Sequence, residues 1–590
     1  MKRTATCGSL RASDDGKTVL LNGWVHRNRD HGGIHFINMR DRYGETQIVV
    51  DEDAPVELAT LAGSLKFEYC IAMEGQVRKR PASMVNPDML TGEIEISVKK
   101  IEILNTCHTL PFMIEEETDS NETARLKYRY LDLRSKGMQN RIILRNKVTW
   151  AIREFLQKDD FLEIETPTLI KSTPEGARDF LVPSRLHAGK FFALPQSPQL
   201  YKQLLMVSGF DKYFQVARCY RDEDARGDRQ LEFTQIDIEM SFVSKDDIFA
   251  VTEGMMGHVF KESLGVDLPA SFERLTYDDA MNLYGSDKPD LRFPLAFHDF
   301  APFVPASEFE VFKGVLKSGG TVKAMVVPGA AADFSRKKIS ALEETAKTYG
   351  AKGLAWMKVT PDGLDGGISK FFTVQANDIK TGLNAKEGDL ILLMGANWKT
   401  ACTSLGAVRS RLGKDLKLID ESQFKFAWII DFPLFDYNEE EKAWEPAHHM
   451  FSMPQHQYLE TMESDPGAVK GDLYDLVLNG YELASGSIRV HDPELQQRIF
   501  NIVGFPKEIA EERFGFLLES FRYGAPPHGG IAAGVDRLVM IMAGKSSIKE
   551  VIPFPKNSAG MSPMDDSPAL VDIDQLQDLH LQVVMPKKEI

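Results

Sequence analysis

The sequence lacks the features of a disulfide-rich secreted protein and of a membrane-spanning protein. Its 590 residues contain only 5 cysteines, which are scattered and form no C-x-x-C pair, so neither a disulfide framework nor a thiolate zinc site is expected. An odd number of cysteines is typical of the reducing cytosol. The N-terminus lacks the apolar core of a signal peptide, and no run approaches the roughly 18 apolar residues of a membrane-spanning helix. We therefore expect a cytoplasmic protein with no membrane partner.

A basic excess is also lacking, since the formal net charge is −16. Taken over the whole chain, this charge argues against a nucleic-acid binder, which usually carries a basic domain. The average hides two regions, however. Residues 1–110 hold 14 basic and 15 acidic side chains, and residues 125–153 hold nine basic and one acidic. The second region is either a solvated helix face or a surface that meets phosphates, so a nucleic-acid partner stays open.

The length predicts about three to five domains. Residues 1–105 read as five short strands separated by turn clusters, which favours a small barrel. An OB-fold is the leading interpretation because its open face suits single-stranded nucleic acid, and another small β module is the alternative. The other predicted parts are a linker (106–140), a split catalytic domain (141–287 and 422–556), an inserted α/β domain (288–421) with a helix over roughly 335–349, and a C-terminal extension (557–590).

The first motif-bearing segment is residues 214–240, where two strand-like runs flank a loop dense in charge. An arginine on a strand, such as Arg218 or Arg221, is costly to bury unless an anion pairs with it, and a triphosphate accepts the planar guanidinium bidentately. The segment is therefore either a triphosphate-binding hairpin or an exposed hairpin with surface ion pairs.

The second segment is residues 528–544, which read HGGIAAGVDRLVMIMAG. Its glycines and alanines suit a strand and a helix that pack closely, and they match neither a dinucleotide-binding glycine pattern nor a P-loop. A helix of small packing residues is one interpretation. Arg537, at the start of that helix among apolar residues, favours a functional role.

The third segment is residues 146–170, which predict a helix followed by a short strand that ends at Glu165, Thr166 and Pro167. Proline restricts that strand to an edge or an interface. The alternative is a helix–strand unit with no special role.

In this order and spacing, the three segments resemble the signature motifs of class II aminoacyl-tRNA synthetases, and the N-terminal barrel narrows the resemblance to the aspartate, asparagine and lysine subgroup. The strings TPEGARD (173–179), QSPQLYK (196–202) and PGAAAD (328–333) are similar to those of bacterial-type aspartyl-tRNA synthetases. The resemblance covers essentially the whole chain. It implies an α+β multidomain fold with an N-terminal OB-fold β-barrel that binds the anticodon, a class II antiparallel-sheet core and an inserted, GAD-like α/β domain. It also implies a homodimer formed through residues 146–170.

The activity that the resemblance implies is that of an aspartate–tRNA ligase. Aspartate attacks the α-phosphate of ATP to form aspartyl-adenylate, and the 3′ end of tRNA-Asp then accepts the aspartyl group. Such chemistry needs positioning and charge stabilisation more than a protein nucleophile. The residues implied to contact ATP are Arg221, Asp222, Glu223, Gln230, Phe233, Glu482, Gly534, Val535, Asp536 and Arg537. Phe233 and Arg537 are expected to stack on opposite faces of adenine.

The resemblance also implies residues for aspartate and for Mg²⁺. Those for aspartate are Glu175, Gln199, Lys202, Arg221, His448 and Arg489. Lys202 and Arg489 are expected to reject asparagine, because a neutral amide leaves buried cations without a counter-charge. Asp475 and Glu482 are expected to hold Mg²⁺ together with ATP phosphates, and a solvated acidic pair is the alternative. The chain reads His448-His449-Met450 where many relatives have a proline after the histidines.

The barrel residues implied to meet the anticodon are Arg29, Phe36, Gln47 and Arg78. Phe36 is either a stacking platform for a base or an ordinary core residue of the barrel. Relatives that charge only tRNA-Asp often carry leucine where this chain has His31. The resemblance associates a second position, Ser83, with the same behaviour. His31 and Ser83 together lead to the hypothesis that tRNA-Asn is charged as well as tRNA-Asp.

Two competing interpretations remain at this point. An asparaginyl or lysyl ligase has the same fold, but Lys202 and Arg489 suit an acidic amino acid. A tRNA-binding or regulatory paralogue that has lost activation is expected to have broken motifs, whereas Arg221, Glu482 and Arg537 are all present.

Overall fold

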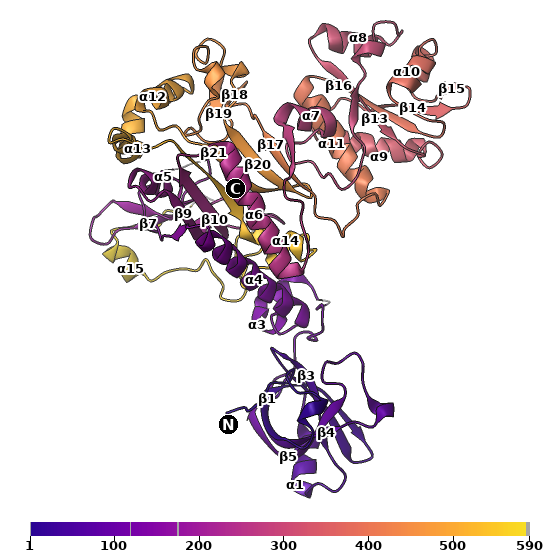
Figure 1. Cartoon of the computed structure of the whole chain (residues 1–590), viewed down its shortest axis with the longest axis vertical. Coiled ribbons are helices and arrows are strands. Elements are labelled where there is room, and N and C mark those ends of the chain that lie inside the picture. The colour runs from indigo at the N-terminus through magenta and orange to yellow at the C-terminus, as the bar shows by residue number, and fades with distance from the viewer. Residues whose placement is uncertain (1, 119, 174–175, 586–590) are drawn as a thin grey trace. The chain divides into compact units, whose positions relative to one another are not determined.

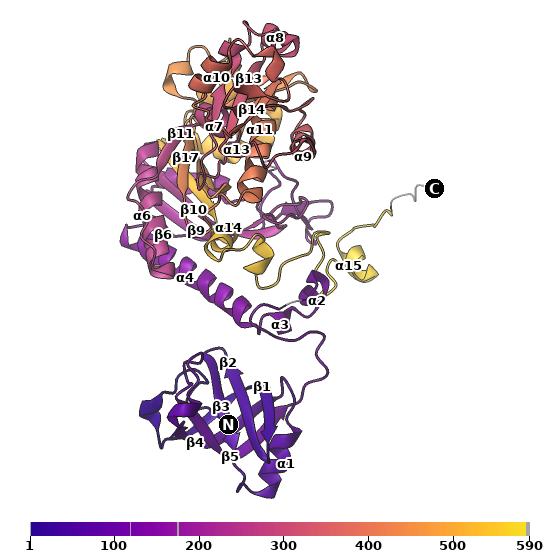
Figure 2. The ribbon, with the colours of Figure 1, turned by 90° about the vertical axis from the view of Figure 1, so that its right-hand side faces the viewer.

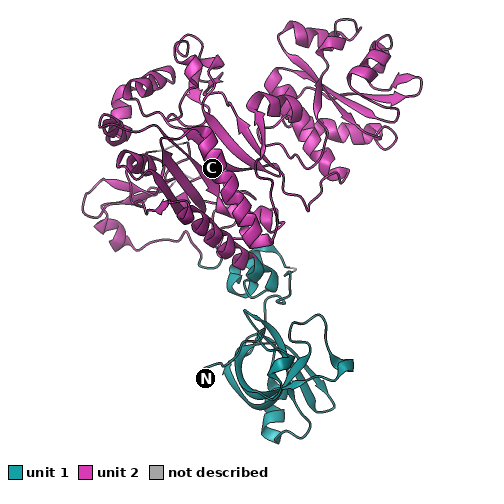
Figure 3. Ribbon diagram, in the orientation of Figure 1, with its two compact units in different colours: residues 1–140, 562–565 teal, residues 141–561, 566–590 magenta. Residues whose placement is uncertain are grey.

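The computed structural model describes residues 2–118, 120–173 and 176–585. The chain divides into two compact units, residues 1–140 with 562–565 and residues 141–561 with 566–590 (Figure 3). No helix in these described ranges is long and apolar enough to cross a membrane.

The first unit is built on a closed barrel with strand order β1-β2-β3-β5-β4 (Figures 1 and 2). Its elements are β1 (Thr18–His31), β2 (Ile34–Asp41), β3 (Gly44–Val50), α1 (Val56–Ser64), β4 (Cys70–Lys79) and β5 (Ile94–Asn105), followed by α2 (Glu122–Lys127) and α3 (Arg129–Asp132). Alternate residues of β1, such as Leu21 and Val25, point into the barrel, as the period of two predicts. The OB-fold prediction is therefore confirmed.

Each arginine of the basic segment 125–153 forms an ion pair with a carboxylate. Arg125 and Arg129 both bond the fully buried carboxylate of Asp132. The other arginine pairs are Arg134–Glu68, Arg141–Glu550, Arg145–Asp536 and Arg153–Glu163. Net charge along the sequence does not reveal these pairs, because several of the carboxylates come from distant residues.

The second unit contains an eight-stranded sheet with strand order β11-β17-β20-β21-β22-β10-β9-β6 (Figure 1). The outer pairs β11–β17 and β6–β9 are parallel, and the inner pairs are antiparallel. The strands are β6 (Leu162–Glu163), β9 (Lys212–Tyr220), β10 (Glu232–Ser241), β11 (Glu273–Thr276), β17 (Phe426–Ile430), β20 (Leu473–Leu478), β21 (Tyr481–Ile488) and β22 (His528–Gly534). Two small hairpins pair β7 (Leu181–Pro183) with β8 (Phe191–Ala193) and β18 (Phe435–Asn438) with β19 (Ala443–Pro446).

The helices of the second unit outside the inserted sheet are α4 (Lys136–Lys158), α5 (Gln199–Val207), α6 (Lys245–Leu264), α7 (Tyr277–Tyr284), α12 (Pro493–Ile502), α13 (Lys507–Phe521), α14 (Val535–Met542) and α15 (Ile573–Asp578). Helix α15 contributes no side chain to the buried core. Ile152 of α4, Phe249 of α6 and Leu538 of α14 share one core cluster with residues of the sheet. Because β10 pairs with both β9 and β22, this core brings the three motif segments together.

A separate five-stranded sheet, with order β12-β13-β16-β14-β15, lies between β11 and β17 in the sequence. Its elements are β12 (Phe297–Asp299), α8 (Glu310–Lys317), β13 (Thr321–Val327), α9 (Arg336–Lys347), β14 (Ala355–Thr360), β15 (Gly363–Asp365), α10 (Ala376–Gly382), β16 (Leu390–Ala396) and α11 (Trp398–Asp415). Helix α9 confirms the helix predicted near 335–349, since the Ser335 side chain accepts a hydrogen bond from the backbone N–H of Lys338. The predicted domain boundaries remain predictions.

Candidate active site

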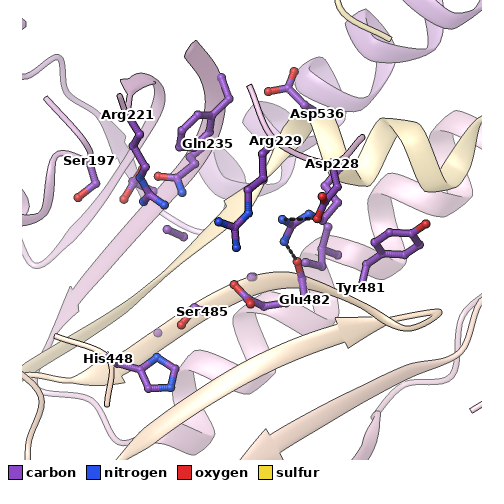
Figure 4. Close-up of a pocket in the computed structure, with 18 of the residues that line it drawn as sticks. Ser197, Arg221, Asp228, Arg229, Gln235, His448, Tyr481, Glu482, Ser485 and Asp536 are labelled. Carbon is purple, nitrogen blue, oxygen red and sulfur yellow. Dashed lines mark hydrogen bonds and ion pairs between the residues drawn. The ribbon is translucent and has the colours of Figure 1, made fainter. Parts of the chain in front are cut away.

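A cavity of about 660 Å³ opens on the eight-stranded sheet. Its walls come from α5, the β9–β10 hairpin, the β20–β21 hairpin and the start of α14, as the lining residues show. Figure 4 shows side chains of Arg221, Arg229 and Glu482 pointing into this space. The predicted site residues that line it are Gln199, Lys202, Arg221, Glu223, Gln230, Phe233, His448, Glu482, Arg489, Gly534, Asp536 and Arg537.

Four predicted site residues are placed otherwise. Glu175 lies outside the described residues. The Asp222 side chain is partly exposed and lies 3.6 Å from Arg178, and Val535 is buried in the core. Asp475 is buried on β20, next to the strand that carries Glu482. These three are not among the cavity's lining residues.

Four fully buried charges form the floor of the cavity. The Lys202 Nζ atom lies 3.1 Å from Asp237 Oδ1 and 3.3 Å from Glu239 Oε2, and the Arg489 Nε–H donates to Glu239 Oε1 at 2.9 Å. All four side chains are at most 2% exposed. The two cations therefore have counter-charges before any ligand binds. This corrects the expectation that a neutral ligand would leave them without counter-charges.

The surroundings of these carboxylates set their pKa values in opposite directions. Burial raises the pKa of Asp237 above its ordinary value, despite the neighbouring charge of Lys202. Burial also acts to raise the pKa of Glu239, but the charges of Arg489 and Lys202 outweigh it and lower the pKa overall. Glu239 is therefore ionised at neutral pH and holds both cations in place.

His449 lies against the same network. Its Nε2 atom is 2.8 Å from Arg489 Nη1, which donates the hydrogen bond because arginine has no acceptor. Burial, and then the charge of Arg489, hold the pKa of His449 well below its ordinary value, and burial also lowers the pKa of His448. Both imidazoles are therefore neutral at pH 7.

Three side chains that line the same cavity each carry a buried polar atom without a partner among the described residues. These atoms are Gln199 Nε2, Arg221 Nε and Asp237 Oδ2. Leaving a polar atom unsatisfied costs about 1–3 kcal/mol. Two of these atoms are donors and one is a carboxylate acceptor, a set whose chemistry matches a small ligand with both carboxylate and ammonium groups.

The other part of the cavity combines an aromatic ring with several arginines. The guanidinium of Arg221 lies 5.1 Å from the centroid of the Phe233 ring. Arg537 bonds Asp228 at 3.2 Å and also the main-chain oxygen of Glu482 (dashed lines in Figure 4). Arg229 lies 3.4 Å from Glu223. A flat base against Phe233, with a polyphosphate among the arginines, fits this chemistry.

Asp536 and Gln230, which are predicted to contact ATP, also form hydrogen bonds between the elements that line the cavity. The carboxylate of Asp536 accepts hydrogen bonds from Arg145 of α4 and, at 2.8 Å, from the backbone N–H of Thr234 on β10. Asp536 thus ties residues 214–240 and the helix α4 to residues 528–544. The amide of Gln230 bonds the backbone N–H and carbonyl of Lys556, at 2.8 and 3.1 Å.

Asp475 and Glu482 lie on neighbouring antiparallel strands, and a β-bulge falls between Leu476 and Val477. Burial, and then the charge of Glu482, raise the pKa of Asp475 well above its ordinary value. Its Oδ1 atom has no hydrogen-bond partner among the described residues. No cluster of three or more His, Cys, Asp or Glu side chains suited to a metal occurs in the described part of the chain. The donors present fit a cation that takes most of its other ligands from a substrate.

In the first unit, three of the four predicted anticodon residues share one hydrogen-bonded row. Arg29 donates to Gln47 at 3.3 Å, Gln47 donates to Glu95 at 3.0 Å, and Arg78 donates to Glu95 at 2.8 Å. Phe36 is half-buried and lies 5.9 Å from the His31 ring, edge to face. It does not belong to the barrel's core cluster, which disfavours the core interpretation. Ser83 is exposed in the segment between β4 and β5.

Several residues of the cavity were not predicted from the sequence. Asp237 and Glu239 occupy alternate positions of an otherwise apolar strand end, IDIEM, and this pattern could have indicated two buried carboxylates on one face. Asp228, Arg229 and Lys288 also line the cavity. Their loop positions gave no comparable signal.

Comparisons with known proteins agree with this geometry. The model of the "tRNA synthetases class II (D, K and N)" family matches residues 121–558, and that of the "OB-fold nucleic acid binding domain" matches residues 19–104. The chain is 65% identical over 585 residues to an "Aspartate--tRNA(Asp/Asn) ligase" of Treponema denticola, covering 99% of each chain. It is 49% identical to an "Aspartate--tRNA ligase" of Macrococcus caseolyticus over 588 residues, covering 100% of this chain and 99% of the relative. An asparaginyl-tRNA synthetase structure from Pyrococcus horikoshii shares the fold, with a TM-score of 0.59, 19% identity, and coverage of 94% of this chain and 98% of that one.

Proposed function

The chain belongs to the class II tRNA synthetases of the D, K and N group, and we propose that it is an aspartate–tRNA ligase that charges both tRNA-Asp and tRNA-Asn. The observation that carries the amino-acid assignment is the buried network of Lys202, Asp237, Glu239 and Arg489 at the floor of the cavity. The names of the Treponema and Macrococcus relatives support the same substrate.

Aspartate binds with its side-chain carboxylate toward Lys202 and Arg489, and its ammonium group toward the free Oδ2 atom of Asp237. The cations have counter-charges already, so discrimination against asparagine rests on geometry. A carboxylate accepts from both cations, whereas the NH₂ group of an amide is a donor that would face them. Arg221 reaches the α-carboxylate and the α-phosphate, and lowers the repulsion between the two anions as they approach.

ATP lies with adenine between Phe233 and Arg537, and its phosphates lie among Arg221, Arg229 and Arg537. Asp475 and Glu482 hold Mg²⁺, which supplies positive charge to the phosphates when bound. No side chain acts as a nucleophile in this scheme. The chain's own contribution is to place the aspartate carboxylate in line with the α-phosphate and to stabilise the charge of the leaving pyrophosphate.

The tRNA is read by the barrel face of Arg29, Phe36, Gln47 and Arg78, where Phe36 stacks on an anticodon base. His31 beside Phe36, together with Ser83, lets the enzyme accept the tRNA-Asn anticodon. The "Asp/Asn" in the name of the Treponema denticola relative supports this part of the proposal.

The active form is a homodimer in the cytoplasm. Strand β6 is an edge strand of the eight-stranded sheet, and Leu162 on it is exposed. Trp150 of the neighbouring helix α4 is 68% exposed, an unusual position for a tryptophan unless another surface covers it. Both lie in the segment that the family resemblance assigns to dimer formation.

Two assays test the function. ATP–pyrophosphate exchange is expected with aspartate and not with asparagine or lysine; exchange with none of the three would favour the non-catalytic paralogue. Aminoacylation of purified tRNA-Asp and tRNA-Asn is expected to proceed with both. The His31→Leu variant is expected to keep tRNA-Asp charging and to lose most tRNA-Asn charging. Background rates on tRNA-Asn with the unmodified enzyme would refute the dual specificity.

A further inference from the structure

The segment between α7 and the inserted sheet passes along the cavity and contributes one cation to it. Lys288 of this segment lines the cavity together with Asp228, Arg229, Glu482 and Arg537. It comes from outside the three motif segments. Its side chain is exposed, and no ion pair of its ammonium group is found within the described ranges.

The segment is fixed on both sides, so Lys288 is held in place. On the side of the catalytic sheet, Asp290 packs against the β20–β21 turn, where a Cβ added to Gly480 would lie only 3.1 Å from the Asp290 Cβ. On the other side, buried Arg409 of α11 donates to the carbonyl oxygen of Asp290 at 3.0 Å and to that of Phe293 at 2.9 Å.

Ion pairs of Arg292 also connect the chain segment that leads into the inserted sheet with the segment that leads out of it. Arg292 bonds Asp290 at 2.7 Å in the entering segment and Glu421 at 2.9 Å in the leaving segment. The Lys288 backbone N–H also donates to Ser286 Oγ at 3.1 Å. This rigidity is more than a simple connection needs, and it fits a segment that positions a side chain.

We propose that Lys288 binds the β- and γ-phosphates of ATP, so that the connection to the inserted domain supplies part of the pyrophosphate site. This inference rests on the proposed function. A phosphate is the matching ligand because the aspartate-binding cations Lys202 and Arg489 are deeply buried and already paired, whereas the Lys288 ammonium is accessible and has no ion pair among the described residues.

The test is ATP–pyrophosphate exchange with Lys288→Ala, Lys288→Arg and the unmodified enzyme. Lys288→Ala is expected to raise the KM for ATP about tenfold or more and to change the KM for aspartate less than about twofold, since a charge-assisted hydrogen bond to phosphate is lost. Lys288→Arg is expected to restore most of the ATP affinity. Lys352→Ala, which removes an exposed lysine of the inserted domain away from the cavity, is the matched control and should leave both KM values unchanged.

A second measurement separates this role from a structural one. The affinity for a non-hydrolysable aspartyl-adenylate analogue, which has no β- or γ-phosphate, is expected to be the same in Lys288→Ala and in the unmodified enzyme. An unchanged KM for ATP, or a loss of analogue affinity equal to the loss for ATP, would overturn the proposal. A defect confined to transfer onto tRNA would also overturn it, and would assign Lys288 to the tRNA 3′ end. Failure of the unmodified enzyme to exchange with aspartate would instead refute the proposed function itself.

Discussion

Glu239→Gln tests the buried charge network most directly, because the change keeps the shape of the side chain and removes its charge. Glu239 is fully buried, 2.9 Å from Arg489 Nε and 3.3 Å from Lys202 Nζ. At an effective dielectric constant of about 20, each such attraction amounts to roughly 5 kcal/mol before desolvation is subtracted. Removing one partner of a buried pair costs about 3–5 kcal/mol net, because the remaining charge is left uncompensated. We expect a loss of that size in the free energy of unfolding of the catalytic unit.

Urea unfolding followed by tryptophan fluorescence measures this loss, since Trp428 is buried in the same sheet. Glu519→Gln is the matched control. It removes the same charge from the ion pair that Glu519 forms with Arg522 at 3.1 Å. The Arg522 side chain is 69% exposed and the Glu519 side chain is 52% exposed. Exposed pairs contribute at most about 1 kcal/mol, so the control should barely move the transition. Equal shifts for the two variants would refute the reasoning that Glu239 is the counter-charge on which the network depends.

Three further predictions follow from single features. Gly530→Ala should destabilise the enzyme and lower its affinity for aspartate, because the new Cβ would lie 2.1 Å from Glu239 Oε2; Gly515→Ala, in a helix with open space around it, should be neutral or slightly stabilising in urea unfolding. Trp150→Glu should yield monomers in sedimentation analysis, and an unchanged dimer would contradict the assigned interface. The pKa values of His448 and His449 are below their ordinary value of about 6.5, so the unfolded chain binds more protons below that pH. The urea concentration at the unfolding midpoint should therefore decrease as the pH is lowered from about 6.5 to 5.5, and it should stay nearly constant above about pH 6.5. A midpoint that does not change over this range would contradict the prediction.

Local patterns in the sequence predicted the local parts of the fold. The alternation along β1 gave the barrel, and the Ser335 cap gave the start of α9, because both depend on neighbouring residues only. The contact between Arg489 and Glu239 joins residues 250 positions apart, and no local pattern indicates which carboxylate meets which cation. The resemblance to a family predicted Arg489 and Lys202 as site residues. It did not predict Asp237 and Glu239, the counter-charges that make the burial of these cations possible.

The arginines of residues 125–153 are a second case in which the local sequence does not reveal the partner of a charged side chain. Their charge summed along the sequence left a solvated face and a surface for phosphates equally open, and it gave no sign that Arg145 bonds Asp536, 391 positions away, and Thr234 on β10. The Arg145 side chain thus fixes residues 528–544 against residues 214–240. Lys288, which gave no signal in the sequence, differs from those arginines in that its charge is accessible and has no ion pair among the described residues.

Residues 528–544 were interpreted either as small packing residues or as a functional segment. At Gly530 the two interpretations agree, because the packing there also determines the position of a site residue. Strand β22 lies beside β10 with Gly530 opposite Glu239. A Cβ at that position would meet both the Glu239 carboxylate and, at 2.1 Å, the backbone oxygen of Ile238. Only glycine lets the two strands pair while Glu239 keeps its bonds to Arg489 and Lys202. The small residue is therefore there for packing, and that packing positions the cations expected to bind the substrate carboxylate.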